Sequence, residues 1–162
     1  MIEVDEAGPD DIDELIRLEV GLFEEDGGVY DRFADTSWPL REGRKDFEDL
    51  MASPDSIVLV ARAVASHTIE SIGFLAGYAS AGSPVRRPMR AAVLRSLYVA
   101  ADHRRSGAAQ LLTEQFLAWA RDQGAAEAQV THYAANHGAA RFYDQIGFTE
   151  QSVFRVLPLD GA

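Results

Sequence analysis

The chain has 162 residues, of which 47% are hydrophobic and 25% are charged, and it contains no cysteine. This composition predicts a single domain over residues 1–162 and excludes disulfides and thiol nucleophiles. The net charge of −11 argues against nucleic acid as a partner, because proteins bind nucleic acid by neutralising phosphates. No apolar run approaches the roughly 18 residues of a membrane helix, so we expect no membrane partner and a cytoplasmic location.

The first half of the chain predicts one strand followed by two helices. Ile2–Val4 indicates a short strand. An amphipathic helix follows, with Asp10 as its N-cap and the sequence "DGGV" at Asp26–Val29 as its end. A second helix is predicted over Lys45–Ala52, and it stops before Ser53-Pro54 because the residue before a proline disfavours helix.

Three apolar runs and a long helix follow. The runs at Ile57–Ala65 and Ile69–Ala79 predict a hairpin, and Ala92–Val99 predicts a third strand. The helix presents Ala109, Leu112, Phe116, Trp119 and Ala120 on one face and ends at Gly124.

The last part of the chain predicts a strand, a short helix and a final strand. The strands are Ala128–Tyr133 and Ser152–Leu159, and the helix between them is capped by Asn136 and closed by Gly147. The complete order is β-α-α-β-β-β-α-β-α-β. This order predicts an α/β (α+β) fold in which a mixed sheet carries helices on both faces.

Acidic residues are concentrated in the first third of the chain. Residues 1–55 hold 18 acidic and 5 basic residues, whereas residues 56–162 hold 8 acidic and 10 basic residues. Solvated acidic helices explain such a bias. The alternative hypothesis is that the first part meets a cation and the second part an anion.

The junction after the strand Ala92–Val99 combines positive charge with small side chains. Arg104 and Arg105 precede Gly107, and two alanines then open the helix. A helix start leaves about four amides without partners and binds phosphate when its backbone can be approached closely. A surface turn with incidental arginines is the alternative. The common phosphate-loop and dinucleotide-binding patterns are absent.

Two segments together resemble a known family. The segment Arg104–Ala109 resembles the R/Q-x-x-G-x-G/A segment of the GCN5-related N-acetyltransferase (GNAT) superfamily, which wraps the pyrophosphate of acetyl-CoA. The later segment "NHGAARFYDQIGF" resembles the family pattern N-x-x-A-x-x-x-Y-x-x-x-G-F at Asn136, Ala139, Tyr143, Gly147 and Phe148. Ala109 stands where many members have a second glycine, which lies within the family pattern.

The resemblance implies a GNAT-like central sheet that is mixed and mostly antiparallel. It also implies an N-acetyltransferase that moves an acetyl group from acetyl-CoA to a primary amine by direct attack in a ternary complex, without a metal. The positions that it marks for binding acetyl-CoA are Leu97, Tyr98, Val99, Arg104, Arg105, Ser106, Gly107, Ala108, Ala109, Asn136 and Tyr143. Tyr143 is also the catalytic candidate, as general acid for the leaving thiolate, although its place on the helix equally suits a core tyrosine.

The general base is not evident from the sequence. Many family members carry a glutamate in or near the central strand, but here the only charge in that strand is Arg95. The candidate acids are Glu24, Glu25, Asp26, Asp31, Asp35 and Glu70, each also explained as a solvated surface residue. A water chain to solvent is a further alternative.

Three further points stay open at this level. The missing strand acid keeps alive a second function, a non-catalytic acyl-CoA-binding or regulatory domain of the same fold. The expected partner of an enzyme is a small-molecule or peptide amine, for which a cation would suit the acidic first part of the chain. Homodimers are common in the family, and the final strand is where we would place such a contact.

Overall fold

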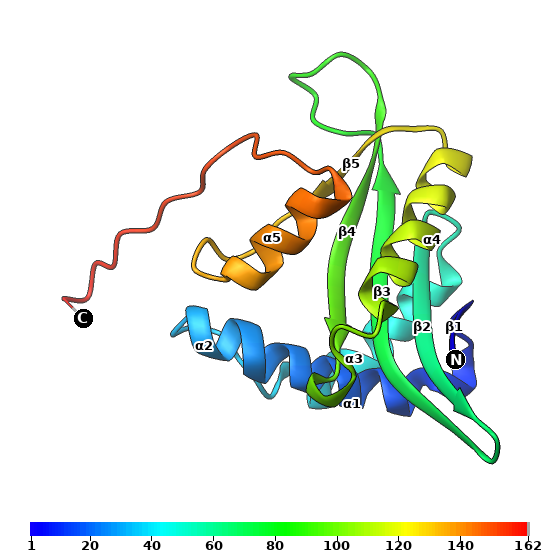
Figure 1. The fold of residues 1–162 in the computed structure, drawn as a ribbon. Helices are drawn as coiled ribbons and strands as arrows, with labels where there is room; N and C mark the ends of the chain where they lie inside the picture. The colour runs from blue at the N-terminus through cyan, green and yellow to red at the C-terminus, as the bar shows by residue number, and fades with distance from the viewer. Residues whose placement is uncertain (162) are drawn as a thin grey trace.

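The computed structural model describes residues 1–161. Its centre is a five-stranded sheet in the order β1-β2-β3-β4-β5 (Figure 1). The strands are β1 (Ile2–Glu6), β2 (Ser56–Ala65), β3 (Thr68–Ser80), β4 (Arg90–Val99) and β5 (Ala125–Val130). The first four pair antiparallel in sequence, and β5 pairs parallel to β4. The predicted mixed, mostly antiparallel sheet is therefore confirmed.

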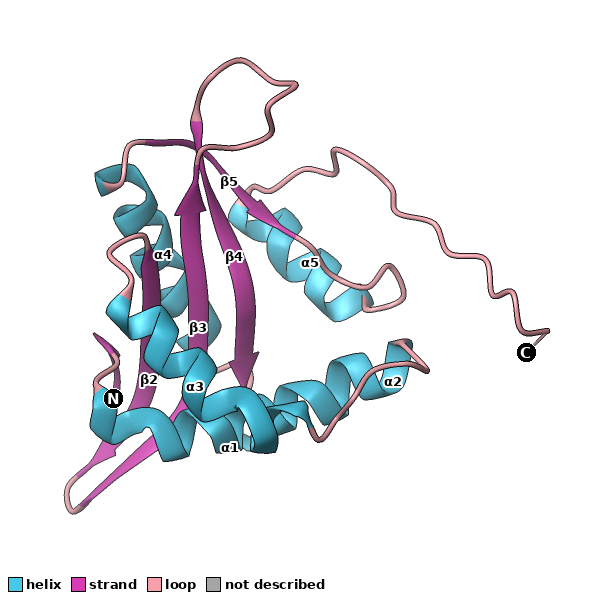
Figure 2. Ribbon diagram, turned by 180° about the vertical axis from the view of Figure 1, so that it is seen from behind, coloured by secondary structure: helices cyan, strands magenta, loops and turns pink. Residues whose placement is uncertain are grey.

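Helices cover both faces of this sheet, as predicted (Figures 1 and 2). They are α4 (Ala108–Asp122) and α5 (His137–Ile146) on one face, and α1 (Ile12–Leu22) and α3 (Trp38–Ala52) on the other. Strand β2 shows why its sequence is apolar throughout: Ile57 and Leu59 pack under α4, whereas Val58 and Val60 pack under α1 and α3. A central strand buried on both faces needs apolar side chains at every position.

The helical run that begins with α1 ends at Tyr30, one residue beyond the predicted end at Asp26–Val29, and it changes helix type on the way. The chain continues through one π-helical turn (Phe23–Gly27) into α2 (Gly28–Tyr30). The glycines here permit close packing instead of ending the helix, because a Cβ on Gly28 would lie 3.0 Å from Thr36 Cγ2. We call the segment from Phe23 to Tyr30 the acidic arm.

Two further elements differ from their predicted bounds by three residues or more. Helix α3 begins at Trp38 instead of Lys45, with Pro39 in its first turn, where proline's missing amide carries no penalty. Strand β5 is Ala125–Val130 instead of Ala128–Tyr133.

The predicted final strand at Ser152–Leu159 is wrong. After Gly147 the chain runs out as an extended tail that leads away from β5 in both views (Figures 1 and 2). The large apolar side chains of this tail are between 74% and 91% exposed: Val153, Phe154, Val156, Leu157 and Leu159. The sequence pattern favours a strand, but a strand also needs a neighbour to pair with, and no described strand lies beside the tail.

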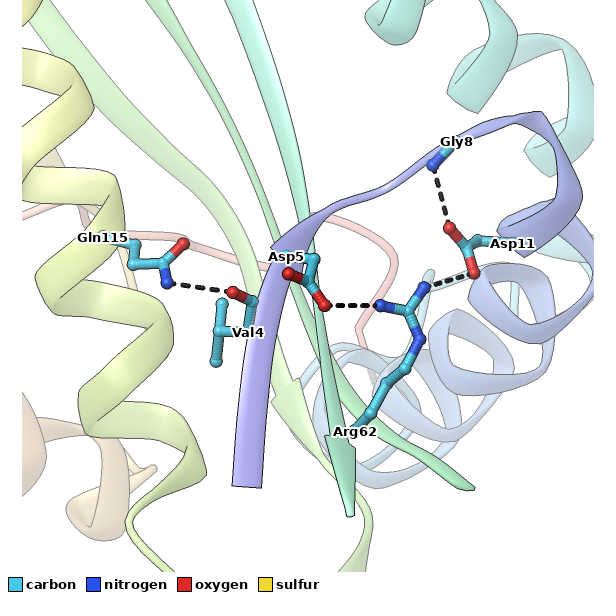
Figure 3. A network of polar contacts seen from close by, with 6 residues as sticks. All are labelled: Val4, Asp5, Gly8, Asp11, Arg62 and Gln115. Carbon is cyan, nitrogen blue, oxygen red and sulfur yellow. Dashed lines mark hydrogen bonds and ion pairs between the residues drawn. The ribbon is translucent and has the colours of Figure 1, made fainter. Parts of the chain in front are cut away.

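The edge strand β1 is fixed by polar contacts on both sides (Figure 3). Arg62 of β2 donates to Asp5 (3.0 Å) and to Asp11 (2.6 Å), which precedes α1. From α4, Gln115 donates to the Val4 carbonyl oxygen (3.0 Å). These bonds fix the point at which the chain leaves the sheet and enters α1.

Candidate active site

Strands β4 and β5 separate part of the way along the sheet. Their pairing ends at Leu94 and Val130, whereas β4 continues alongside β3 as far as Val99. Just after the last pair, Arg95 is an extra residue in the register between β3 and β4, which makes a β-bulge. The side of Leu97–Val99 that faces β5 therefore has no strand partner.

The segment Arg104–Ala109 lies between the end of β4 and the start of α4. Gly107 is the N-cap of α4 with φ 90°, and Arg105 also has a positive φ of 60°. Within residues 1–161, the amides of Arg105, Ser106 and Gly107 donate no hydrogen bond. A Cβ on Gly107 would meet nothing within 4 Å, so the helix start is open to approach. Unpaired amides at a helix start suit an anion such as a pyrophosphate.

The two arginines of this segment differ in their contacts. Arg104 donates from Nε to the Val99 carbonyl oxygen (3.2 Å) and from Nη2 to Glu25 on the acidic arm. Arg105 is exposed and has no ion pair among the described residues. Arg104 thus links the segment before α4 to the acidic arm. The sequence did not predict this contact.

The second motif places Asn136 and Tyr143 beside the same opening. Asn136 accepts the Ala139 amide (3.1 Å), which confirms the predicted cap, and donates to Asp26 of the acidic arm (3.0 Å). Tyr143 is 8% exposed and stacks on His132 with 5.9 Å between ring centroids. Burial, and secondarily the Asp26 carboxylate, raises the pKa of Tyr143, so its hydroxyl stays protonated at neutral pH. Its predicted role as general acid stays a prediction.

A cleft of about 550 Å³ lies between the acidic arm and β4. Its acidic and basic lining residues are four carboxylates and one arginine: Glu19, Asp26, Asp31, Asp35 and Arg95. Two aromatic side chains of the wall, Phe23 and Trp38, stack with 5.8 Å between ring centroids. All four carboxylates come from residues 1–55, so part of the acidic bias of this region is concentrated in the cleft.

The candidate bases from the sequence divide into two groups. Asp26, Asp31 and Asp35 line the cleft, whereas Glu24, Glu25 and Glu70 do not. Hydrogen bonds from Arg41 and then Ser37 lower the pKa of Asp35 to about 2, so this carboxylate stays charged and paired.

The sequence-based list of candidate bases lacks Glu19. This side chain is 1% exposed, although it also lines the cleft. Its Oε1 lies 3.9 Å from Arg95 Nη2, and its Oε2 has no hydrogen-bond partner among residues 1–161. Burial raises the pKa of Glu19 to about 7; the nearby Arg95 opposes this rise and Asp46 adds to it. The available signal was an acid on the apolar face of α1, next to Leu18 and one turn after Leu15.

A second hollow differs from this cleft in its chemistry. A cavity of about 330 Å³ between the end of α3 and Trp119 has Glu6 as its single ionisable lining residue. Within residues 1–161, no cluster of histidine, aspartate and glutamate side chains could hold a metal ion. No helix in this part of the chain is both long and apolar enough to cross a bilayer.

Solved structures with this architecture include acetyltransferases. A tetramutant of the BH1408 protein from Bacillus halodurans superposes with a TM-score of 0.83 at 20% identity, covering 97% of this chain and 99% of that chain. The aminoglycoside N-acetyltransferase AAC(6')-Iy in complex with CoA gives 0.74 at 13% identity, covering 99% and 95%. The aminoglycoside 6'-N-acetyltransferase AAC(6')-Ih from Acinetobacter baumannii gives 0.74 at 16% identity, covering 99% and 100%. At these identities the structures establish the fold.

The sequence itself gives the family. No curated protein matches it. The model of the Acetyltransferase (GNAT) family matches residues 24–148, which include all of the acidic arm except Phe23, the separated strands and both motifs. This chain therefore belongs to the Acetyltransferase (GNAT) family.

Proposed function

We propose that this protein is an acetyl-CoA-dependent N-acetyltransferase whose acceptor is a primary amine on a small cationic molecule. The observation that carries the proposal is the position of the acidic cleft. It opens at the unpaired side of β4, and the open helix start of α4 lies at the end of the same strand. One site for an anion and one for a cation thus meet at a strand edge, as a direct transfer between two bound substrates requires.

The residues at the helix start fit the phosphates of acetyl-CoA. The amides of Arg105, Ser106 and Gly107 have no acceptor among the described residues, and the space in front of Gly107 is open. Ala108 and Ala109 follow without bulky side chains, and Arg104 and Arg105 add positive charge. Backbone groups of Leu97–Val99 would hold the arm that carries the thioester. Asn136 and Tyr143 would complete the site from the side of α5.

The cleft fits a small cation better than a neutral amine. Its four carboxylates outnumber its one arginine, and a volume of about 550 Å³ is in the range of small-molecule pockets. Two of the similar structures are aminoglycoside acetyltransferases, whose named substrates are also amines. An aminoglycoside, a polyamine or another small molecule with several amines has the matching charge.

Calorimetric titration with acetyl-CoA is the first test. We expect micromolar binding to the wild type, weakened about tenfold or more (about 1.4 kcal/mol) in Arg104→Ala/Arg105→Ala. Glu25→Gln is the matched control, because it removes the partner of Arg104 and leaves both arginines in place. We expect this variant to bind acetyl-CoA at least as tightly as the wild type. Equal affinity in the wild type and the double variant would contradict the assignment of the helix start.

Thiol release then separates the enzyme from the alternative function. The bulged Arg95, in a strand without an acid, is the observation that favours a non-catalytic acyl-CoA-binding domain. We expect thiol release from acetyl-CoA with spermidine or kanamycin, and much less with a neutral amino sugar derivative. Binding of acetyl-CoA without thiol release from any amine would identify the non-catalytic domain instead.

The tail supports a homodimer. Its exposed apolar side chains and the unpaired outer edge of β5 are two surfaces that stable proteins rarely leave in water. The tail leads away from its own β5 (Figure 1). Pairing of each tail with the sheet edge of a second copy would cover both surfaces at once.

A further inference from the structure

Glu19 differs from the other carboxylates of the cleft in having a buried oxygen without a hydrogen-bond partner among residues 1–161. Asp26 accepts from Asn136, Asp31 accepts the Phe33 amide (2.9 Å), and Asp35 accepts from Arg41 (2.8 Å). In Glu19, by contrast, Oε2 is buried with no hydrogen bond. Such an atom is unfavourable in a folded protein unless something outside the chain uses it.

The surroundings of Glu19 do not neutralise it fully. Arg95 approaches from β4, but its guanidinium makes two hydrogen bonds with Asp46 of α3 (3.1 Å and 2.7 Å). Arg95 Nη2 lies 3.9 Å from Glu19 Oε1, which is too far for a hydrogen bond. Arg95 and Asp46 are the charged groups that act on Glu19 from the packed elements, and they have opposite signs. Glu19 is therefore a buried acid without a dedicated counter-ion.

We propose that Glu19 accepts a proton from the ammonium group of the acceptor, so that the neutral amine can attack. This inference rests on the proposed N-acetyltransferase function. Glu19 is buried in the wall of the acidic cleft, and the bulged Arg95 beside it marks the point where β4 loses its partner β5. An ammonium group in the cleft would give the Glu19 carboxylate the hydrogen-bond donor that it lacks, on the side of Oε1, because Oε2 lies beside Gly43 of α3.

The step balances as follows. One N–H bond of the ammonium breaks, and its proton goes to the Glu19 carboxylate. The freed electron pair on nitrogen forms the bond to the thioester carbon, and the C–S bond breaks with its electron pair on sulfur. A second proton from nitrogen balances the thiolate, which leaves as a thiol. Glu19 then returns its proton to solvent.

The acid–base properties of Glu19 suit this role. Burial raises its pKa to about 7, where a carboxylate is still charged in about half of the molecules at neutral pH and is a stronger base than an ordinary glutamate. Below this pH the carboxyl is protonated and cannot accept a proton. The rate of transfer should therefore fall on the acidic side of about pH 7.

Thiol-release kinetics from pH 6 to 9 test the inference, with saturating acetyl-CoA and whichever of spermidine or kanamycin reacts faster. In Glu19→Gln we expect kcat/KM for the amine to fall about 100-fold or more. We also expect the acidic limb of the pH profile, which is the fall in rate below about pH 7, to disappear. Glu19→Asp should keep the limb at a reduced rate. Glu14→Gln makes the same change on the exposed side of α1, and it should keep both the rate and the pH profile.

Acetyl-CoA titration and circular dichroism of each variant separate the outcomes. Unchanged acetyl-CoA affinity together with the lost limb supports the proton-accepting role. A Glu19→Gln enzyme with the wild-type limb, or one whose acetyl-CoA affinity falls in parallel, would overturn that role and make Glu19 a packing residue. A wild type that binds no acetyl-CoA would reject the proposed function itself. If the wild type and Glu19→Gln release thiol at the same rate, only the Glu19 inference is rejected.

Discussion

The buried carboxyl of Glu19 has a consequence for stability as well as for activity. Its pKa is about 7 in the folded chain, against an ordinary value of 4.5. Between these values the folded state holds a proton that the unfolded state has released, so the free energy of unfolding falls as pH rises. Above about pH 7 the folded state carries the full cost of burying the charged carboxylate. A pKa shift of this size corresponds to roughly 3 kcal/mol of unfolding free energy.

Glutamine at this position should therefore stabilise the protein in a pH-dependent way. We expect Glu19→Gln to exceed the wild type in free energy of unfolding by up to roughly 3 kcal/mol at pH 8, and by about half as much at pH 5.5. Urea denaturation at the two pH values measures this difference. A difference that is the same at both would show that the charge of Glu19 is not the cause.

Among the elements, β1 depends most on a single side chain. Arg62 bonds to both Asp5 and Asp11, and its own side chain is only 21% exposed (Figure 3). Arg62→Met would leave two carboxylates without their partner, one of them the partly buried Asp11. We expect a loss of about 1–3 kcal/mol in the free energy of unfolding, measured by urea denaturation.

The matched control for this prediction is Lys45→Met. Lys45 pairs with Asp49 on the surface of α3, where both side chains are largely exposed. Exposed pairs contribute about 0.5 kcal/mol or less. Equal losses in the two variants would mean that the Arg62 network contributes no more than a surface ion pair.

Local signals explain which elements the sequence predicted. The cap at Asn136 and the closing Gly147, with φ 113°, depend on residues within one helix, so their pattern is visible in the chain. The tail at Ser152–Leu159 has an equally clear strand pattern, but pairing depends on a partner that the pattern does not contain. The sequence did not identify Glu19 as a candidate base for the same reason, because its burial depends on the packing of α3 and β4 against α1.

The family motifs predict where acetyl-CoA binds, and that site stays a prediction, whereas the contacts between the acidic arm and the two motif segments were not predictable from the sequence. The two motif segments do border one opening, as the resemblance implies. The hydrogen bonds that Arg104 donates to Glu25 and that Asn136 donates to Asp26 join segments far apart in sequence. No spacing rule connects such positions, since the acidic arm reaches them only through the π-helical continuation of α1.

For the whole molecule, the exposed tail makes a prediction about oligomeric state. We expect the protein to form a dimer at about 100 µM in light scattering coupled to size exclusion, and a chain ending at Gln151 to be monomeric. Phe154→Asp/Val156→Asp should also give a monomer, because it places charge on the apolar tail. Gln151→Asp, at the base of the tail, should remain dimeric. A monomeric wild type would contradict the proposed homodimer.

The divergence of β4 and β5 places a strand edge in the middle of the sheet. Up to Leu94, β4 is an interior strand, and beyond it the same strand has one side unpaired. Such an edge can recruit other polypeptide strands and promote aggregation. Here a wall of negative charge borders it, and Tyr30 contacts Tyr133 across the opening with 5.6 Å between ring centroids. The side chains that form the cleft are therefore placed to keep this unpaired side of β4 from pairing with strands of other chains.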